Sequence, residues 1–139
     1  MYLYNIGLEE QMLSKDDIVR VLKGYEWPRD QYWITAGAGM VMHGIRKSTA
    51  DIDAGCTTGL MDMLLDSNAG EYFEKCGRAI KVDDIIELFE NWNVDSVEII
   101  DGFQVASIES IKKQKLKLGR EKDMADISAI EAYLSNISK

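Results

Sequence analysis

The stretch that decides the fold is residues 32–56, which read YWITAGAGMVMHGIRKSTADIDAGC. Residues 32–35 are aromatic and β-branched and therefore predict a strand. That strand runs into the small-residue turn Ala36-Gly37-Ala38-Gly39, after which residues 40–45 predict a short helix. A second predicted strand covers residues 51–56. The stretch therefore predicts a strand, a glycine-rich turn, a helix and a second, acidic strand.

The glycine-rich turn is the first candidate binding element. The first turn of a helix exposes free N–H groups and the positive end of the helix dipole, which suits phosphate. Glycine also lets a phosphate approach the backbone closely. Gly37, Ala38 and Gly39 are therefore candidate phosphate-binding residues. Small residues before a helix also occur for packing alone, so both interpretations stay open.

The acidic strand is the more informative element. Residues two apart in a strand share a face, so Asp51 and Asp53 point together while Ile52 enters the opposite layer. Two adjacent carboxylates repel each other, and strand interiors disfavour Asp. A hard cation between them would explain the pair, since Mg²⁺ uses few carboxylates plus substrate phosphates. The alternative is an exposed edge strand with two solvated acids.

The remaining elements extend outward from this stretch. Ser14 followed by acidic residues predicts the cap of an N-terminal helix over about 14–25. Two hairpins are predicted, the second turning at Asp101-Gly102, and residues 83–91 also fit a helical period. The other predicted elements are a helix over 60–65, hairpin strands over 78–82 with 85–89 and 96–100 with 103–106, a helix from Ser107 to Gly119, and a helix over 122–137.

This order of elements predicts a single α/β domain with a mixed sheet over residues 1–139. Its catalytic core would span about 32–106, and C-terminal helices would span about 107–137. The 139 residues carry sixteen basic and twenty-four acidic side chains, for a net charge of −8. That charge argues against a general nucleic-acid coat and against a protein that binds anionic membranes.

The expected cellular compartment follows from targeting signals and motifs that the sequence does not contain. No apolar run approaches the roughly 20 residues of a membrane span, and the N-terminus has no basic region followed by an apolar stretch. Cys56 and Cys76 are too far apart for a C-x-x-C motif, so two reduced thiols are expected. We therefore expect a cytoplasmic protein.

A basic segment lies inside this acidic chain. Residues 112–122 contain six cations, and Lys112 and Lys115 are three apart, so they are like-charged neighbours on one helix face. A bound phosphate would relieve their repulsion, which makes Lys115 and Arg120 candidates for phosphate contact. The alternative is a solvated helix face.

These pieces together resemble a known family. Gly37-Ala38, the spacer 39–50 and Asp51-Ile52-Asp53 resemble the nucleotidyltransferase fold of the polymerase-β type, although Ala38 stands where Gly or Ser is usual. Residues 115–127 resemble small nucleotidyltransferase-like proteins related to AbiE-type abortive-infection toxins. The resemblance spans roughly residues 32–130 and implies a mixed sheet flanked by helices.

The resemblance also implies a reaction and a set of site residues. An NMP would be transferred from an NTP to an acceptor hydroxyl, with Mg²⁺ or Mn²⁺ held by Asp51, Asp53 and a third carboxylate. Our candidate is Glu87, a lone acid in the apolar run 85–89, with Asp83, Asp84 and Glu98 as rivals. The other implied residues are Lys115 in catalysis and Gly37, Ala38, Gly39, Thr49, Arg120 and Asp123 in nucleotide binding.

Two other functions stay open. One is a nucleotide-binding module without chemistry, which a missing third carboxylate would favour. The other is the toxin of a toxin–antitoxin pair, whose acceptor would be RNA or a protein rather than a small molecule. The short chain leaves little room to recognise an acceptor, so an antitoxin partner or a homodimer is also predicted.

Overall fold

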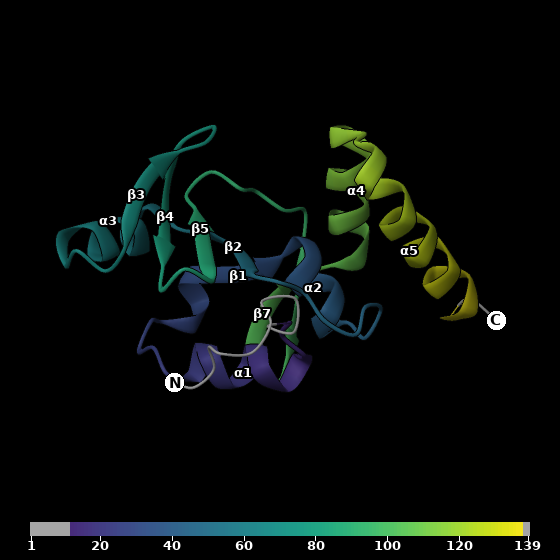
Figure 1. Cartoon of the computed structure of the whole chain (residues 1–139), viewed down its shortest axis with the longest axis horizontal. Coiled ribbons are helices and arrows are strands. Elements are labelled where there is room, and N and C mark those ends of the chain that lie inside the picture. Colours follow the sequence, from purple (N-terminus) through teal and green to yellow (C-terminus); the bar gives the residue numbers. More distant parts are fainter. Residues whose placement is uncertain (1–11, 138–139) are drawn as a thin grey trace.

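The computed structural model describes residues 12–137, which form five helices and seven strands with two short 3₁₀ turns (Figure 1). The predicted lack of a leader at the N-terminus concerns residues outside that range. The helices are α1 Lys15–Lys23, α2 Ala36–Met42, α3 Thr58–Asp66, α4 Ile108–Leu118 and α5 Met124–Ile137, and the 3₁₀ turns are η2 Arg29–Gln31 and η3 Glu121–Asp123. The strands are β1 Tyr32–Thr35, β2 Ile52–Cys56, β3 Glu71–Glu74, β4 Arg78–Val82, β5 Ile86–Phe89, β6 Val97–Ile100 and β7 Phe103–Ala106.

All seven strands join one mixed sheet in the order β3-β4-β5-β2-β1-β7-β6. Strand β2 runs antiparallel to β1 and parallel to β5, and β1 runs parallel to β7. The acidic strand β2 is therefore near the middle of the sheet, with a neighbour on each side. The predicted mixed sheet flanked by helices is confirmed, and the interpretation of Asp51 and Asp53 as acids on an exposed edge strand is wrong.

Both predicted hairpins form. Strands β4 and β5 pair antiparallel, as do β6 and β7 around Asp101-Gly102. The helical alternative for residues 83–91 is wrong, because β5 pairs on both sides and alternates in burial: Ile86 and Leu88 are fully buried while Glu87 is half-buried on the other face. Strand β3 was not predicted, although Tyr72 and Phe73 gave it β propensity.

The glycine-rich turn is itself helical, which corrects the predicted helix over 40–45. Helix α2 begins at Ala36, whose φ of 55° makes the sharp exit from β1, and ends at Met42. The small side chains bring this helix close to its neighbours. Ala38 is 1% exposed, and a Cβ on Gly39 would stand 2.7 Å from the Ile111 Cδ1 atom of α4.

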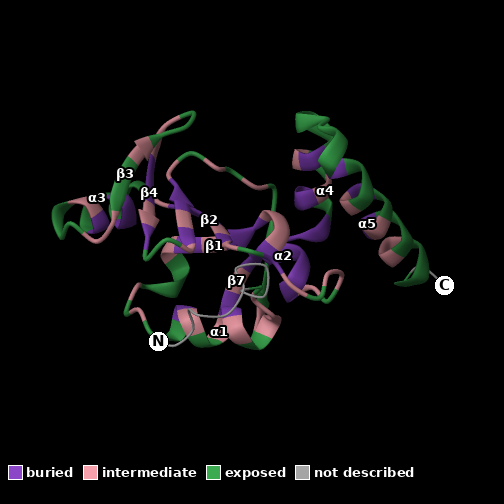
Figure 2. Ribbon diagram, in the orientation of Figure 1, coloured by how far each residue is buried: buried purple, intermediate pink, exposed green. Residues whose placement is uncertain are grey.

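Two apolar clusters hold the fold. The larger joins α1, α2 and α3 to one face of the sheet, with Ile18, Leu64 and Ile86 among its fully buried members. The smaller joins α2 to α4 and α5 through Met40, Ile111 and Ile130. Figure 2 shows the central strands and the inner side of α4 as buried, whereas much of the outer surface of α5 is exposed. None of the helices in residues 12–137 has the length and apolar character that crossing a membrane requires.

The helix ends follow their sequence signals. Ser14 caps the start of α1, as the sequence predicted, and together with Asp17 it forms a capping box. Ser107 caps α4, and Gly119 ends it in the left-handed conformation with φ 60°. Because both ends of α4 are fixed, the residues that α4 turns toward the sheet have defined positions.

Candidate active site

A pocket of about 610 Å³ opens where the middle strands, α4 and two connecting segments meet. Its volume lies within the usual range of small-molecule sites. The described residues that line it are Thr35, Ala36, Asp53, Lys75, Cys76, Glu87, Phe89, Asn91, Trp92, Asn93, Ile111, Gln114, Lys115, Lys117, Leu118 and Arg120. Acidic side chains thus come from the sheet and most of the cations from α4 and the turn after it.

The strand register brings the acids together. Asp53 of β2 is the Cα partner of Thr35 on β1 and of Glu87 on β5. Directly paired residues of adjacent strands point to the same side of a sheet. Asp53 and Glu87 therefore project side by side into the pocket, and Asp51 stands immediately before β2.

The surroundings of Asp53 disfavour the charged form of its carboxyl group. Burial raises the pKa of its carboxyl to about 7, and the negative charges of Asp51 and Glu87 add to that rise while Lys75 and Lys115 oppose it. Its Oδ1 atom is buried and has no hydrogen-bond partner among residues 12–137. A buried oxygen without a donor is rare in native structures and calls for an explanation.

Glu87 is the acid that the structure brings to Asp53. Its Oε2 atom lies 3.7 Å from Lys81 Nζ, its Cα partner on β4. The three rivals lie elsewhere: Asp83 and Asp84 form the β4–β5 turn, where Asp83 accepts a hydrogen bond from the Tyr25 hydroxyl, and Glu98 lies exposed on the outermost strand β6.

The cationic wall centres on Lys115. Its side chain is 8% exposed, and its Nζ lies 3.1 Å from Asp126 Oδ2 and 3.6 Å from Asp123 Oδ1. Asp123 also accepts two hydrogen bonds from the Arg120 guanidinium, at 2.7 and 3.0 Å. Those bonds, with the charge of Lys115, hold the pKa of Asp123 below its usual range despite its burial. Lys115 and Arg120 line the pocket, and Asp123 supports both from behind.

The other predicted nucleotide-binding residues are placed differently. A Cβ on Gly37 would stand 3.0 Å from both Arg46 Nη1 and Thr49 Oγ1, so these two side chains cover that glycine. Ala38 and Gly39 face apolar neighbours within the protein. Of the residues from Ala36 to Gly39, the one that lines the pocket is Ala36. A role in phosphate binding for Gly37 and Thr49 stays a prediction.

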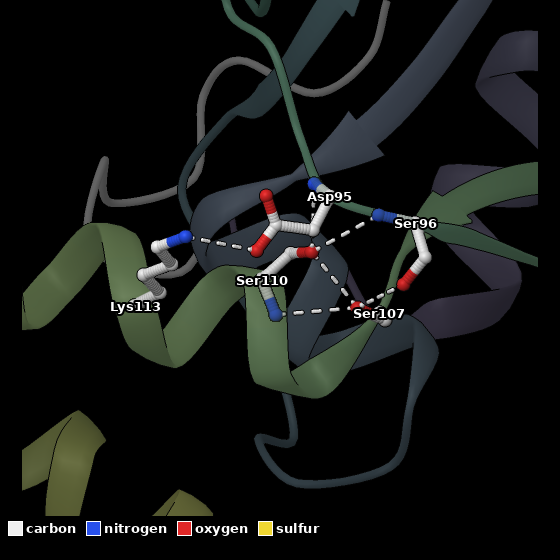
Figure 3. A network of polar contacts seen from close by, with 5 residues as sticks. All are labelled: Asp95, Ser96, Ser107, Ser110 and Lys113. Atoms are coloured by element: carbon white, nitrogen blue, oxygen red, sulfur yellow. Dashed lines mark hydrogen bonds and ion pairs between the residues drawn. The ribbon is translucent and has the colours of Figure 1, made fainter.

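Most of the basic segment is neutralised within the protein. Lys112 pairs with Glu131 at 3.3 Å, and Lys113 pairs with Asp95 at 3.1 Å, as Figure 3 shows. Lys117 differs, because it lines the pocket and makes no ion pair with any of residues 12–137. Lys112 and Lys113 are therefore used in ion pairs away from the pocket, whereas Lys115, Lys117 and Arg120 line it.

Asp53 and Glu87 supply oxygen ligands of the kind that Mg²⁺ takes, but too few to complete its coordination by themselves. No group of three His, Cys, Asp or Glu side chains within residues 12–137 is arranged to enclose an ion by itself. The unpartnered Asp53 oxygen beside Glu87 offers hard, anionic ligands, which Mg²⁺ prefers and usually completes with phosphate oxygens and water.

Sequence reasoning missed several pocket residues. Lys75 and Cys76 arrive on the β3–β4 turn, and Asn91, Trp92 and Asn93 on the segment after β5. Trp33 donates a hydrogen bond from Nε1 to the Trp92 carbonyl at 2.9 Å, and both groups fill the space that a side chain on Gly55 would occupy. The signal available was Phe89, which stands two residues after Glu87 and therefore shares its face.

The comparisons with known proteins agree with this architecture. No family model matches the sequence, and no curated protein matches it. Among solved structures, the chain is similar to the crystal structure of a "putative nucleotidyltransferase" from Thermotoga maritima. That alignment has a TM-score of 0.57 and 16% sequence identity, and it covers 92% of this chain and 98% of the other. At this identity the likeness shows the fold alone, which is nucleotidyltransferase-like.

Proposed function

We propose that this protein is a magnesium-dependent nucleotidyltransferase that moves an NMP from an NTP to an acceptor hydroxyl. The observation that carries the proposal is the paired placement of Asp53 and Glu87 in one pocket, opposite the buried cation Lys115. The nucleotidyltransferase-like fold supports the same reaction class. A pocket carboxyl group whose pKa is strongly raised, as that of Asp53 is, is also typical of active sites.

Asp53 and Glu87 would hold Mg²⁺ together with oxygens of the triphosphate, and the nearby negative charge of Asp51, which does not line the pocket, would add to their attraction for the ion. When bound, the ion supplies Lewis-acid stabilisation of the phosphates and lowers the pKa of the acceptor hydroxyl. Glu87 accepts the hydroxyl proton on a carboxylate oxygen. The acceptor oxygen then forms a bond to the α-phosphorus, the bond from that phosphorus to the β-phosphate oxygen breaks, and pyrophosphate leaves.

The chain's own cations stabilise the charge that moves onto the leaving group. Lys115 lines the pocket, and its ion pairs with Asp123 and Asp126 hold its ammonium in place, so it does not need to reorganise during the reaction. Arg120 lines the pocket on the same side and is fixed by its hydrogen bonds to Asp123. Lys75 and Lys117 add positive charge at the rim.

The test separates binding from chemistry in one preparation. Each α-labelled NTP is incubated with Mg²⁺ and three acceptor sets: total RNA, total protein and small-molecule extract. Label should enter one set with the wild-type protein. Glu87→Gln should keep NTP affinity within a few fold and lose transfer, because its effect falls on the transition state.

The matched control is Glu98→Gln, an acid on β6 that lies away from the pocket and should leave transfer unchanged. Binding of NTP without transfer to any set would instead indicate a nucleotide-binding module. The proposed kinship with AbiE-type toxins has its own readout, since expression of the wild type but not of Glu87→Gln should then arrest growth.

A further inference from the structure

Part of the pocket lining differs in chemistry from the carboxylates and the cations. Phe89 and Trp92 form an aromatic pair with ring centroids 5.1 Å apart and planes at 65°. Three amide side chains, those of Asn91, Asn93 and Gln114, line the same pocket. Flat aromatic surface combined with amides that both donate and accept hydrogen bonds is what a heteroaromatic ring needs.

These polar groups are not used by the protein itself. Within residues 12–137, the side-chain amides of Asn91, Asn93 and Gln114 make no hydrogen bond. The Trp92 indole N–H is buried and also lacks a partner among those residues. Buried donors without an acceptor are rare, so this one points to a state in which an acceptor is supplied.

The segment that carries these groups is held at both ends. At one end, the Trp92 carbonyl accepts the Trp33 indole hydrogen bond at 2.9 Å. At the other, the backbone N–H groups of Asp95 and Ser96 donate to Ser110 Oγ at 3.1 and 3.3 Å, and Ser110 in turn bonds Ser107 (Figure 3). Figure 1 shows this segment running from β5 toward α4. Its polar side chains are therefore presented by a fixed backbone, which lowers the entropy lost on binding.

We propose that Phe89, Asn91, Trp92, Asn93 and Gln114 form the nucleobase-binding part of the pocket. This inference rests on the proposed function, because it places the base of the incoming nucleotide there while the triphosphate lies between the carboxylates and Lys115. The aromatic pair contacts the ring of the base, and the amides with the indole N–H contact its polar edge.

The test compares a nucleotide with a ligand that has the phosphates but no base. Calorimetry in the presence of Mg²⁺ measures the affinity of each of the four NTPs and of inorganic tripolyphosphate. The wild type should bind at least one NTP about tenfold or more tightly than tripolyphosphate, consistent with the usual worth of base stacking. The variants Asn93→Ala, Gln114→Ala and Trp92→Phe should reduce that advantage several fold and leave tripolyphosphate binding unchanged.

Matched controls are Asn136→Ala, an exposed amide on α5, and Trp27→Phe, whose ring stacks on Tyr25 away from the pocket. Neither substitution should alter the ratio of NTP affinity to tripolyphosphate affinity. Equal affinity of the wild type for all NTPs and tripolyphosphate would overturn the base site while leaving the phosphate site intact. A single-stranded RNA oligonucleotide is titrated in the same way. If the three pocket variants lose affinity for this RNA and keep their affinity for NTPs, the surface binds the acceptor and the base-site proposal is overturned. Failure of tripolyphosphate to bind would count against the proposed function itself.

Discussion

Asp53 and Asp123 are two poorly exposed aspartates on either side of Lys115, and their surroundings are opposite. Asp123 is 1% exposed, accepts two hydrogen bonds from Arg120 and has a lowered pKa. Asp53 has a buried oxygen without a partner and a pKa raised to about 7. A carboxylate whose hydrogen-bond and charge partners come from the protein stabilises the fold. A carboxylate that has no such partners is available to a ligand. The comparison predicts opposite consequences for the same substitution at the two positions.

The largest expected effect is on activity at Asp53. Asp53→Asn should reduce nucleotidyl transfer by at least roughly 10²–10³-fold, because one anionic ligand for Mg²⁺ and for the transition state is lost. The measurement is transfer of labelled NMP by wild type and variant at equal concentration. Asp66→Asn, an exposed acid on α3, is the control and should transfer normally. Full activity of Asp53→Asn would remove this carboxylate from the proposed site.

The second effect is on stability at Asp123. Asp123→Asn should lower the free energy of unfolding by roughly 2–3 kcal/mol, because it removes a buried charge that pairs with Arg120 and Lys115. Urea denaturation at pH 8 measures the change. Asp53→Asn in the same experiment should be more stable than the wild type. A stability loss at both positions would mean that the two acids do not differ as described.

The third effect is a pH dependence that only Asp53 should produce. Its pKa rises from the model-compound value of 3.8 to about 7 on folding, so the folded protein holds a proton that the unfolded chain releases. Stability contributed by this group is therefore present below about pH 4 and is lost progressively as pH rises toward 7. The advantage of Asp53→Asn should grow from pH 4 to pH 7 and then level off. Thermal melts across that range in the absence of divalent ions measure it.

The smallest effect concerns a solvent-exposed ion pair. Lys113→Ala removes the 3.1 Å contact with Asp95, whose partners are both largely exposed. Its cost should be less than about 0.5 kcal/mol, because water already screens the two charges. Chemical denaturation in low and high salt would measure it, and a loss as large as that of Asp123→Asn would show that burial is not the deciding variable.

Local sequence signals predicted most of this fold. The hairpin at Asp101-Gly102, the caps at Ser14 and Ser107 and the end of α4 at Gly119 depend on a few adjacent residues. The start of α2 at Ala36 was missed, because tertiary packing against Ile111 favours a helix through two glycines that have little intrinsic preference for one.

The candidate site likewise contains residues that local sequence signals predicted and residues that depend on long-range contacts. Alternation in β2 pointed to Asp51 and Asp53, and the family resemblance led to Glu87 as one of four candidates for a third carboxylate. The register then placed Asp53 beside Glu87. Lys75, Trp92 and Asn93 reach the pocket on connecting segments whose positions depend on long-range contacts, such as that between Trp33 and Trp92. A single sequence carries no periodic signal for such residues.

Gly55 shows how this arrangement would respond to mutation. The Trp33 ring and the Trp92 carbonyl, 2.6 Å from where a Cβ would stand, already occupy its side-chain space. Even an alanine there would clash first with the Trp33 ring and then with the Trp92 carbonyl, and so would displace the contact that holds the segment after β5. If the proposed base site is correct, Gly55→Ala should weaken the preference among nucleotides more than it weakens transfer, although Gly55 does not line the pocket.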